Sequence, residues 1–436
     1  MTNESADVIV IGAGVAGLTA TRRLAEAGLR VLILEARDRI GGRVWTTHAA
    51  NGAPVELGAE FIHGRPPAIC DLVRSSNLEA REFDGQQWIH AGGKLQRSPD
   101  FFARVKSILD QMSDDGPDRS FADFLGSSVG DDATKLWGLD HVEGFQGALA
   151  ERISVRSLIR SRKAEKEVDG GRTFRLAHGY QALLQALKDA LPSNLVSMRL
   201  NTVVHAVHWA EHDVRIQAQT ATGPVEFSAP RALVTLPLGV MQAAHNASGA
   251  VRFEPALLTK ASPLLLLYMG QTMRISLVFS QRWWEQLAPS GEQGALRDMG
   301  IVFSYKEWFP TWWTQESVPT LTGWAASRRG ERLSGKPDVF IRDKALESLT
   351  SIFEFPRPEL EAMLQSWHVH DWQSDPYARG SYSYVGVGGE GAQAELAAPL
   401  EGTLFFAGEA TNTEGHHGTV HGAIATGERA AREILS

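Results

Sequence analysis

Near its N-terminus the chain carries, over residues 7–17, the sequence DVIVIGAGVAG. The short β-branched run 7–11 predicts a buried strand, because a parallel strand covered on both faces is continuously apolar. Apolar residues at helical spacing over 15–27 predict a helix, and the apolar run 31–34 predicts a second strand. Together these elements predict a βαβ unit of a parallel, doubly wound α/β sheet.

The glycines of this unit suit a nucleotide-binding turn. Gly12 makes the tight turn, Gly14 lets the backbone approach a pyrophosphate, and Gly17 allows close packing of the helix, whose N-terminus faces the anion. Ala16 in the same turn is a further candidate contact. Glu35 follows the second strand, where an acidic side chain can bind the hydroxyls of an adenosine ribose. The unit therefore predicts a dinucleotide site.

The segment after Glu35 distinguishes a flavin-binding site from a site for a nicotinamide dinucleotide. It has the sequence ARDRIGGR over 36–43, in which two adjacent glycines precede an arginine that can bind the same pyrophosphate. Here the chain resembles the glutathione-reductase-like FAD proteins, and among them the GGR-containing branch of amine oxidases, desaturases and protoporphyrinogen oxidases. The resemblance implies FAD, with contacts from a set of residues in this segment: Ala36, Arg37, Gly42 and Arg43. An exposed basic turn is the alternative.

The C-terminal end supplies a second half of the site. A strand from Leu404 runs into Gly408 and Glu409, and a glycine-rich loop then leads to a predicted helix over 419–435. The positive end of a helix stabilises an anionic reduced flavin. The resemblance implies contacts of Gly408 and Glu409 with the ribityl and pyrophosphate groups. It likewise implies that Thr419 and Val420 lie beside the pyrimidine ring; an ordinary amphipathic helix is the alternative.

Because both ends of the chain would form one cofactor site, the segment between them must leave the nucleotide domain and return. Three short strands are expected at the return: 201–204, 214–216 and 232–237. Val204 matches the adenine-contacting valine of the family. We therefore expect a Rossmann-like FAD-binding domain of residues 1–80, 196–262 and 396–436, and a discontinuous mixed α+β substrate domain of residues 81–195 and 263–395. The polar stretch 161–172 is expected to be a solvated loop.

Three stretches narrow the resemblance to amine oxidases. The sequence VELGAEFIHG over 55–64 resembles the loop that polyamine oxidases place against the flavin. The segment 375–384 resembles one shared by polyamine oxidases and lysine-specific histone demethylases, and TVHGA over 419–423 belongs to the same subgroup. The resemblance implies further cofactor contacts at Gly58, Ala59, Glu60 and Phe61, and catalytic roles for His63, Trp372, Tyr382 and Arg274.

Several positions depart from the family pattern. Ser381 stands where animal monoamine oxidases carry a flavin-linking cysteine, so FAD should be noncovalent. Their two cage tyrosines align with Tyr382 and Thr419, which leaves one aromatic wall, and Trp372 is the candidate for another. Arg274 stands where a lysine normally presents a water to flavin N5, and an arginine fork is not equivalent to a lysine. The alternative is an alignment slip that makes Arg274 an edge-strand charge.

Composition limits the remaining possibilities. The 436 residues carry a net charge of −8, which disfavours nucleic-acid binding. Cys70 is the single cysteine, so an internal disulfide and a thiolate metal cluster are excluded, and a reducing cytoplasm is expected. We expect no signal peptide, no membrane span and no metal site at the histidine pairs 416–417 and 368/370. Eight of the twelve tryptophans lie between residues 283 and 372, which suggests an aromatic substrate chamber.

These observations predict an FAD-dependent amine oxidase that converts a primary or secondary amine to an imine and then a carbonyl product, and reduces O2 to H2O2. The alternatives are a flavin dehydrogenase with another electron acceptor and, because of Arg274, a flavin-binding protein with reduced catalysis. Histone demethylation is not expected, since neither a chromatin-binding domain nor a long heptad hairpin is evident. The amine (polyamine, aromatic monoamine or amino acid) and the oligomeric state, for which a homodimer is one option, stay open.

Overall fold

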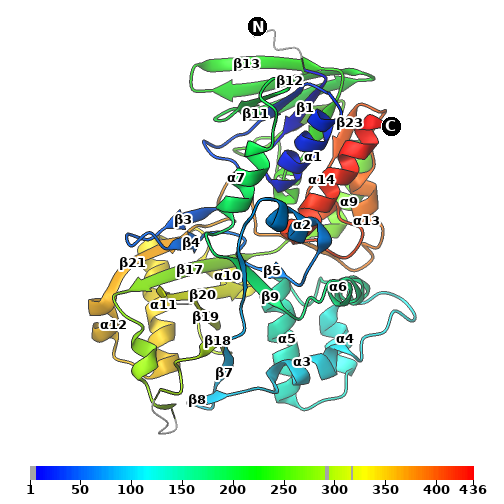
Figure 1. Ribbon diagram of the computed structural model, residues 1–436. Coiled ribbons are helices and arrows are strands. Elements are labelled where there is room, and N and C mark those ends of the chain that lie inside the picture. Colours follow the sequence, from blue (N-terminus) through cyan, green and yellow to red (C-terminus); the bar gives the residue numbers. More distant parts are fainter. Residues whose placement is uncertain (1–5, 290–293, 316–317) are drawn as a thin grey trace.

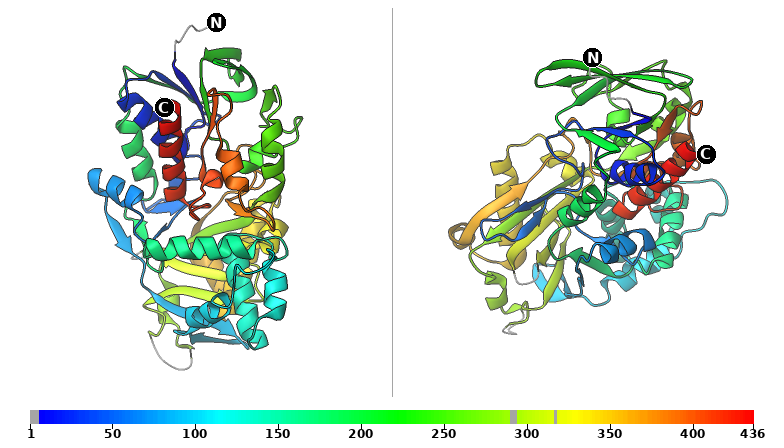
Figure 2. Two further views of the ribbon diagram at one scale, coloured as in Figure 1. Left: turned by 90° about the vertical axis from the view of Figure 1, so that its right-hand side faces the viewer. Right: turned by 45° about the horizontal axis from the view of Figure 1, so that its top comes forward.

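The computed structural model describes residues 6–289, 294–315 and 318–436 (Figure 1). Residues 1–5 of the predicted FAD domain, and 290–293 and 316–317 of the predicted substrate domain, lie outside this description. Figure 2 shows from two further sides that the chain forms two stacked parts. The upper part contains both ends of the chain, and the lower part contains most of the middle.

The upper part is built on a five-stranded sheet in which all neighbouring strands are parallel, in the order β10-β2-β1-β14-β23. These strands are β1 (Val8–Ile11), β2 (Val31–Leu34), β10 (Val196–Arg199), β14 (Ala232–Val234) and β23 (Leu404–Phe406). They come from the three ranges expected to form the FAD domain. Helix α1 (Val15–Glu26) connects β1 to β2, so the predicted βαβ unit is present.

Strand alternation explains the layers around this sheet. Val8 and Val10 of β1 pack against α1, α7 (Gln181–Asp189) and α14 (Val420–Leu435), whereas Ile9 and Ile11 point to the other face. That face is covered by a four-stranded sheet, in the order β13-β12-β11-β15. Its strands are β11 (Val203–Ala210), β12 (Asp213–Thr220), β13 (Gly223–Ala229) and β15 (Arg252–Glu254). The central strands are therefore buried on both faces, as their unbroken apolar sequence predicts.

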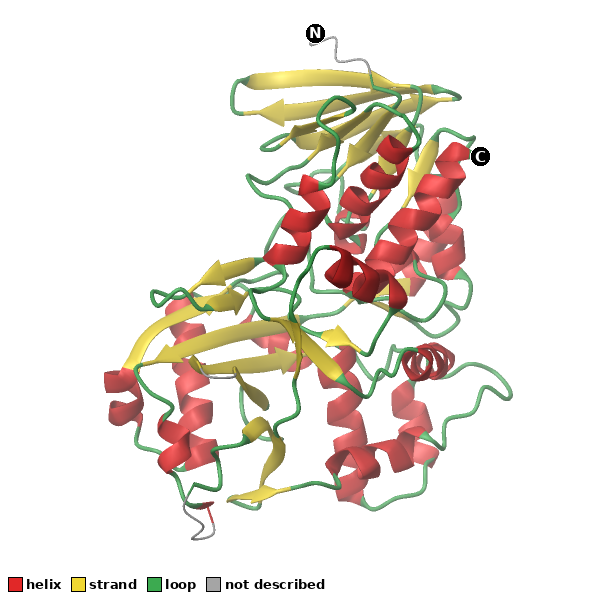
Figure 3. Ribbon diagram, in the orientation of Figure 1, coloured by secondary structure: helices red, strands yellow, loops and turns green. Residues whose placement is uncertain are grey.

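The lower part combines a sheet with a group of helices (Figure 3). The seven-stranded sheet has the order β21-β17-β20-β19-β18-β7-β8. Its strands are β7 (Gln86–Ala91), β8 (Lys94–Arg97), β17 (Thr272–Phe279), β18 (Met299–Ser304), β19 (Thr311–Gln315), β20 (Val318–Ala326) and β21 (Leu364–Val369). Apolar side chains of α11 share a core with β17 and β20. The flanking helices are α10 (Arg328–Leu333), α11 (Asp338–Phe353) and α12 (Arg357–Met363).

A second group of helices packs around its own apolar core beside this sheet. These helices are α3 (Phe101–Leu109), α4 (Phe121–Ser127), α5 (Asp132–Gln146) and α6 (Val155–Glu167). Shorter elements join the two parts: β3 (Thr46–His48), β4 (Pro54–Glu56), β5 (Ile62–His63), α2 (Pro67–Ser75), β6 (Ala80–Glu82), β9 (Thr173–Leu176), α8 (Leu238–Met241), α9 (Ala261–Leu266), β16 (Leu267–Met269), β22 (Ser383–Val385) and α13 (Ala392–Ala397). No helix in the described ranges is both long and apolar enough to cross a bilayer.

Two sequence-based expectations need correction. The solvated loop expected over 161–172 is wrong for its first half, which belongs to α6; Ser154 caps this helix and Leu158 and Ala164 are buried along one face. Charged residues dominate this stretch and the buried face of the helix contains only one residue per turn, so the sequence pattern did not indicate a helix. Helix α7 lies in the range expected for the substrate domain, yet Leu183 and Leu187 share the core of α1. A boundary near residue 176 fits this packing better than the expected one at 196.

Candidate functional site

A cavity of about 1080 Å³ runs from the carboxyl ends of β1 and β2 to the helices α3, α5 and α6. The carboxyl edge of a parallel sheet is where ligands bind in doubly wound folds. The cavity lining contains all but one of the residues proposed from the sequence: Gly12, Gly14, Ala16, Glu35, Ala36, Arg37, Gly42, Arg43, Gly58, Ala59, Glu60, Phe61, His63, Val204, Arg274, Trp372, Tyr382, Gly408, Glu409, Thr419 and Val420. Residues that are far apart in the chain thus share one cavity.

Gly17 is the proposed residue outside the lining. A Cβ atom at this position would lie 2.1 Å from the carbonyl oxygen of Gly12, so Gly17 allows α1 to approach the turn. Gly12 itself has a φ of +109°, which disfavours any side chain. Gly14 differs, because a Cβ atom there would meet no protein atom within 4 Å. The backbone at Gly14 therefore borders open cavity, as a close approach to a pyrophosphate requires.

Glu35 is fixed by backbone donors at the end of β2. Its Oε2 accepts a hydrogen bond from the backbone N–H of Ala13 at 2.8 Å, and its Oε1 accepts one from Arg37 at 3.0 Å. The side chain is buried, yet it borders the cavity. Because each carboxylate oxygen has a further lone pair, Glu35 can still accept hydrogen bonds from a ligand hydroxyl.

The arginine of the GGR segment pairs with the C-terminal end of the chain. Arg43 Nη1 lies 2.8 Å from Glu409 Oε1 and donates to the carbonyl of Ser381 at 2.9 Å. Glu409 also accepts hydrogen bonds from the Ser383 hydroxyl at 2.6 Å and from the Gly418 N–H at 2.8 Å. Burial alone would raise the pKa of Glu409, but Arg43 and Ser383 hold it below its ordinary value. This side chain stays an anion beside the cavity.

Helix α14 begins at the same place. Thr419 caps the helix by accepting a hydrogen bond from the Gly422 N–H at 3.0 Å, and both Thr419 and Val420 border the cavity. The helix N-terminus and its partial positive charge therefore face the cavity. A ligand that gains negative charge there would be stabilised.

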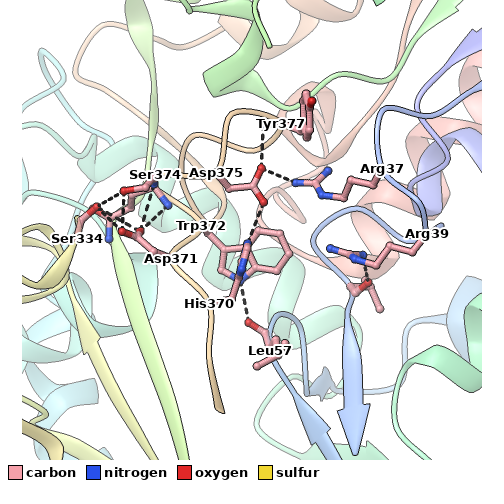
Figure 4. Close-up of polar contacts among 12 residues, drawn as sticks. Arg37, Arg39, Leu57, Ser334, His370, Asp371, Trp372, Ser374, Asp375 and Tyr377 are labelled. Carbon is pink, nitrogen blue, oxygen red and sulfur yellow. Dashed lines mark hydrogen bonds and ion pairs between the residues drawn. The ribbon is translucent and has the colours of Figure 1, made fainter. Parts of the chain in front are cut away.

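An ionic network that the sequence did not assign holds Arg37 (Figure 4). Asp375 lies 2.7 Å from Arg37 Nη2 and 2.8 Å from His370 Nε2, and it accepts a hydrogen bond from the Tyr377 N–H at 2.8 Å. Burial alone would raise the pKa of Asp375, but His370 and Arg37 lower it well below its ordinary value. Asp375 belongs to the recognised segment 375–384, which was the available signal, but its partners are remote in sequence.

The same loop fixes the neighbouring turn. Trp372 Nε1 donates a hydrogen bond to the carbonyl of Leu57 at 2.8 Å, and its ring lies 4.3 Å from that of His370 (Figure 4). Trp372 also borders the cavity, so it can form part of an aromatic wall. A Cβ atom at Gly58 would lie 1.9 Å from the carbonyl oxygen of Arg43, which explains the glycine after Leu57.

Arg274 is buried in the cavity wall and is part of a four-residue polar cluster. Its Nη2 lies 2.5 Å from Glu60 Oε2, and its Nη1 donates to the carbonyl of Gly58 at 3.0 Å. Glu60 also pairs with Arg175 at 2.6 Å and accepts a hydrogen bond from Trp313 Nε1 at 3.1 Å. Burial alone would raise the pKa of Glu60, but Arg175 and Arg274 lower it. Two cations thus share one carboxylate, which leaves a net positive charge.

Glu56, which sequence reasoning missed, lies behind this cluster. It is 8% exposed and accepts hydrogen bonds from the Tyr180 N–H at 2.7 Å and from the Thr46 hydroxyl at 2.8 Å. Burial raises the pKa of Glu56 to about 7, although these bonds and the charge of Arg274 act against the rise. The charge balance around Arg274 therefore changes near neutral pH.

The expected aromatic chamber is present in part. Trp313, Trp324 and Trp372 border the cavity, whereas Trp283 and Trp312 are fully buried in the core of the lower part.

Tyr382 borders the cavity and donates its hydroxyl hydrogen to the carbonyl of Phe145 at 2.7 Å. Burial lowers the pKa of His63 to about 4, so its imidazole is neutral at pH 7. Among the described residues, no His, Cys, Asp and Glu side chains group to hold a metal ion.

A nucleotide-binding turn joined to a second helix N-terminus and an aromatic cavity defines a flavin-type oxidoreductase site. Residues 15–435 match the family described as flavin containing amine oxidoreductase, and the chain belongs to this family. The predicted family is confirmed.

The chain is similar to a human lysine-specific histone demethylase 2 (27% identity, 98% of this chain, 53% of the relative) and a rice lysine-specific histone demethylase 1 homolog 2 (30%, 99% and 57%). It is also similar to rice polyamine oxidase 4 (28%, 98% and 88%). The chain thus spans little more than half the length of the demethylases it matches.

Solved structures agree with the fold. A putrescine oxidase bound to putrescine superposes with a TM-score of 0.81 at 20% identity, and 99% of each chain is covered. The cyclohexylamine oxidase from Brevibacterium oxydans IH-35A superposes with a TM-score of 0.78 at 22% identity, with 99% of this chain and 98% of that chain covered. The expected mixed α/β fold is confirmed at this level.

Proposed function

We propose that the chain is an amine oxidase that binds FAD noncovalently in a Rossmann-like, glutathione-reductase-like domain. The observation that carries this proposal is the convergence of Glu35, Arg43, Glu409 and the start of α14 on one cavity, although they lie at opposite ends of the sequence. The residues suit the cofactor in shape too. A Cβ atom at Gly408, as at Gly14, would meet no protein atom within 4 Å, so backbone borders open space where a pyrophosphate would lie.

The hydroxyl at the family's linking position supports noncovalent binding. Ser381 donates its hydroxyl hydrogen to the carbonyl of Gly270 at 2.8 Å, so this side chain is engaged with the backbone. A serine hydroxyl also cannot form the thioether that a cysteine forms. The flavin would then be held by Glu35, by the Arg43 region and by α14.

FAD held by Glu35, the Arg43 region and α14 would supply the acceptor for a hydride from the carbon beside the amine nitrogen, with O2 as the oxidant that yields H2O2 and water hydrolysing the imine. The protein's part is to position the amine and to remove water from it. His63 and the indoles of Trp313 and Trp372 form an uncharged wall, which disfavours the ammonium form and favours the reactive neutral amine. No strongly basic side chain is needed.

Charge pairing in the cavity favours an amine over an amino acid. Lys106 and Arg162 both pair with Asp110, and Arg172 pairs with Glu82. Arg274 is likewise paired with Glu60. A substrate carboxylate near Lys106, Arg162 or Arg172 would have to compete with Asp110 or Glu82, whereas an uncharged amine competes with neither.

Two measurements test the proposal. Acid precipitation of the purified protein should release yellow FAD into the supernatant; flavin in the pellet or release of FMN would contradict it. Anaerobic addition of a panel of amines should bleach the flavin absorbance, and admission of O2 should restore it with formation of H2O2. Bleaching without peroxide would instead identify a dehydrogenase, and no bleaching with any amine would identify a flavin-binding protein without this activity.

A further inference from the structure

The part of the cavity farthest from the parallel sheet, which we call the helical arm, is bounded by α3, α5 and α6. Helix α3 contributes Phe101, Val105 and Leu109, which are four residues apart and therefore lie on one face. Leu158 of α6 borders the same space. These side chains give this extension of the proposed active site an apolar face, beside the charged groups of the same lining.

A row of rings connects the inner cavity with this arm. Ring centroids are separated by 5.4 Å between His63 and Phe145, 5.7 Å between Phe145 and His141, and 6.2 Å between His141 and Phe102. Phe303 continues the row at 5.9 Å from Phe102, and all five residues border the cavity. Burial lowers the pKa of both His63 and His141 to about 4, so the row is uncharged at neutral pH.

Two rings of the row keep much of their surface free. Phe102 is 42% exposed and Phe145 is 44% exposed, although both border the cavity. Large apolar side chains with this much free surface in a concave site indicate an apolar ligand. Phe145 is also held in place, because its carbonyl accepts the Tyr382 hydroxyl and the adjacent carbonyl of Gly144 accepts Trp324 Nε1 at 2.9 Å.

The charged groups around the arm do not form a fixed ionic subsite. Lys106 and Arg162 are paired with Asp110, as described above. Burial raises the pKa of Glu143 and of Glu165 above the ordinary value of a carboxyl group. Charges of both signs therefore border the arm, since its lining contains the cations Lys106, Arg162, Lys166 and Arg329 beside Asp140, Glu143 and Glu165, and it has no excess of negative charge for a second ammonium group.

We propose that the helical arm binds the apolar tail of a primary monoamine, and that Phe102 and Phe145 set the preference for chain length. This inference rests on the proposed amine oxidation and names the substrate class for it. The tail of the proposed substrate carries no second charge. A diamine of equal length would have to bring its second ammonium group into this arm, where it loses hydration and lies among the cations Lys106, Arg162, Lys166 and Arg329.

A homologous series of substrates tests the inference. In the wild-type holoenzyme, kcat/KM should rise about two- to fourfold for each methylene from n-butylamine to n-octylamine, because each buried methylene contributes binding free energy. 1,8-Diaminooctane should be at least tenfold poorer than n-octylamine. Phe102→Ala and Phe145→Ala should lower the gain per methylene, and Phe145→Leu should restore part of it. The control is Leu258→Ala, at a side chain that is 81% exposed outside the cavity lining.

The outcomes separate this inference from the proposed function. If amines bleach the flavin but kcat/KM is independent of chain length, or the diamine is preferred, the inference is overturned and the function stands. If neither variant changes the gain per methylene, the arm is not the tail site. If no amine bleaches the flavin, the proposed function fails, and calorimetric titration of the holoenzyme decides the inference. n-Octylamine should then bind at least tenfold more tightly than n-butylamine, and equal affinities would overturn it.

Discussion

Glu56→Gln should stabilise the protein at pH 8 and have little effect at pH 5. Glu56 is buried behind the Arg274 cluster, and both of its carboxyl oxygens accept hydrogen bonds. A glutamine has the same shape as a protonated glutamate and cannot ionise. It keeps an acceptor for the Tyr180 N–H and a donor toward the Thr46 oxygen. The substitution thus removes the ionisation and leaves the packing.

The size of the effect follows from the raised pKa. Burial raises the pKa of Glu56 from 4.5 to about 7. Between pH 4.5 and pH 7, Glu56 is therefore protonated in the folded state and ionised in the unfolded state. The free energy of unfolding of the wild type therefore falls as pH rises from about 4.5 to about 7, and is constant above. The difference between the pKa of Glu56 in the unfolded and in the folded state corresponds to a loss of about 3 kcal/mol in the free energy of unfolding at high pH. An entropy of unfolding of about 2.1 cal/mol/K per residue, taken over 436 residues, converts this free-energy difference into a rise of about 3 °C in Tm for Glu56→Gln at pH 8.

Urea denaturation and thermal melting of the holoprotein at pH 5 and pH 8 measure this difference. The exposed Glu226 of β13 offers a matched control, and Glu226→Gln should change stability equally at both pH values. The stability gain of Glu56→Gln should appear only at the higher pH. A gain of equal size at both pH values, or a wild type that is more stable at pH 8 than Glu56→Gln, would refute the argument.

Three further changes probe the site. Glu35→Ala should weaken flavin binding at least tenfold in titrations of the apoprotein, since a lost charged hydrogen bond costs about 1.5–3 kcal/mol; unchanged affinity would mean that the nucleotide binds elsewhere. Arg274→Met should slow reoxidation by O2 more than anaerobic flavin reduction in stopped-flow experiments, and Arg274→Lys should preserve the reoxidation rate; the opposite pattern would make Arg274 a substrate contact. Asp375→Asn should lower both flavin affinity and Tm, because Arg37 and His370 lose a charged acceptor; an unchanged Tm would speak against the network.

The sequence was informative where function depends on local backbone geometry. The turn from Gly12 to Gly17, the acidic residue after β2 and the cap of α14 at Thr419 each require a particular residue type at a particular position. Such requirements can be read from one segment at a time. The same holds for the buried strands β1 and β2, whose unbroken apolar runs fit only the centre of a sheet covered on both sides.

The polar clusters could not be derived in this way, because their members come from separate segments. Glu60 meets Arg175 and Arg274 only because β9 and β17 both border the loop after β4, and nothing local to any of these segments indicates the contact. The position of Arg274 was identified, but its partner was not, and the partner changes its chemistry. An isolated guanidinium is a fixed positive charge, whereas one paired with Glu60 in front of Glu56 belongs to a cluster whose net charge depends on pH. The role of Arg274 is therefore a property of the fold, and substituting its partner Glu60 should alter that role.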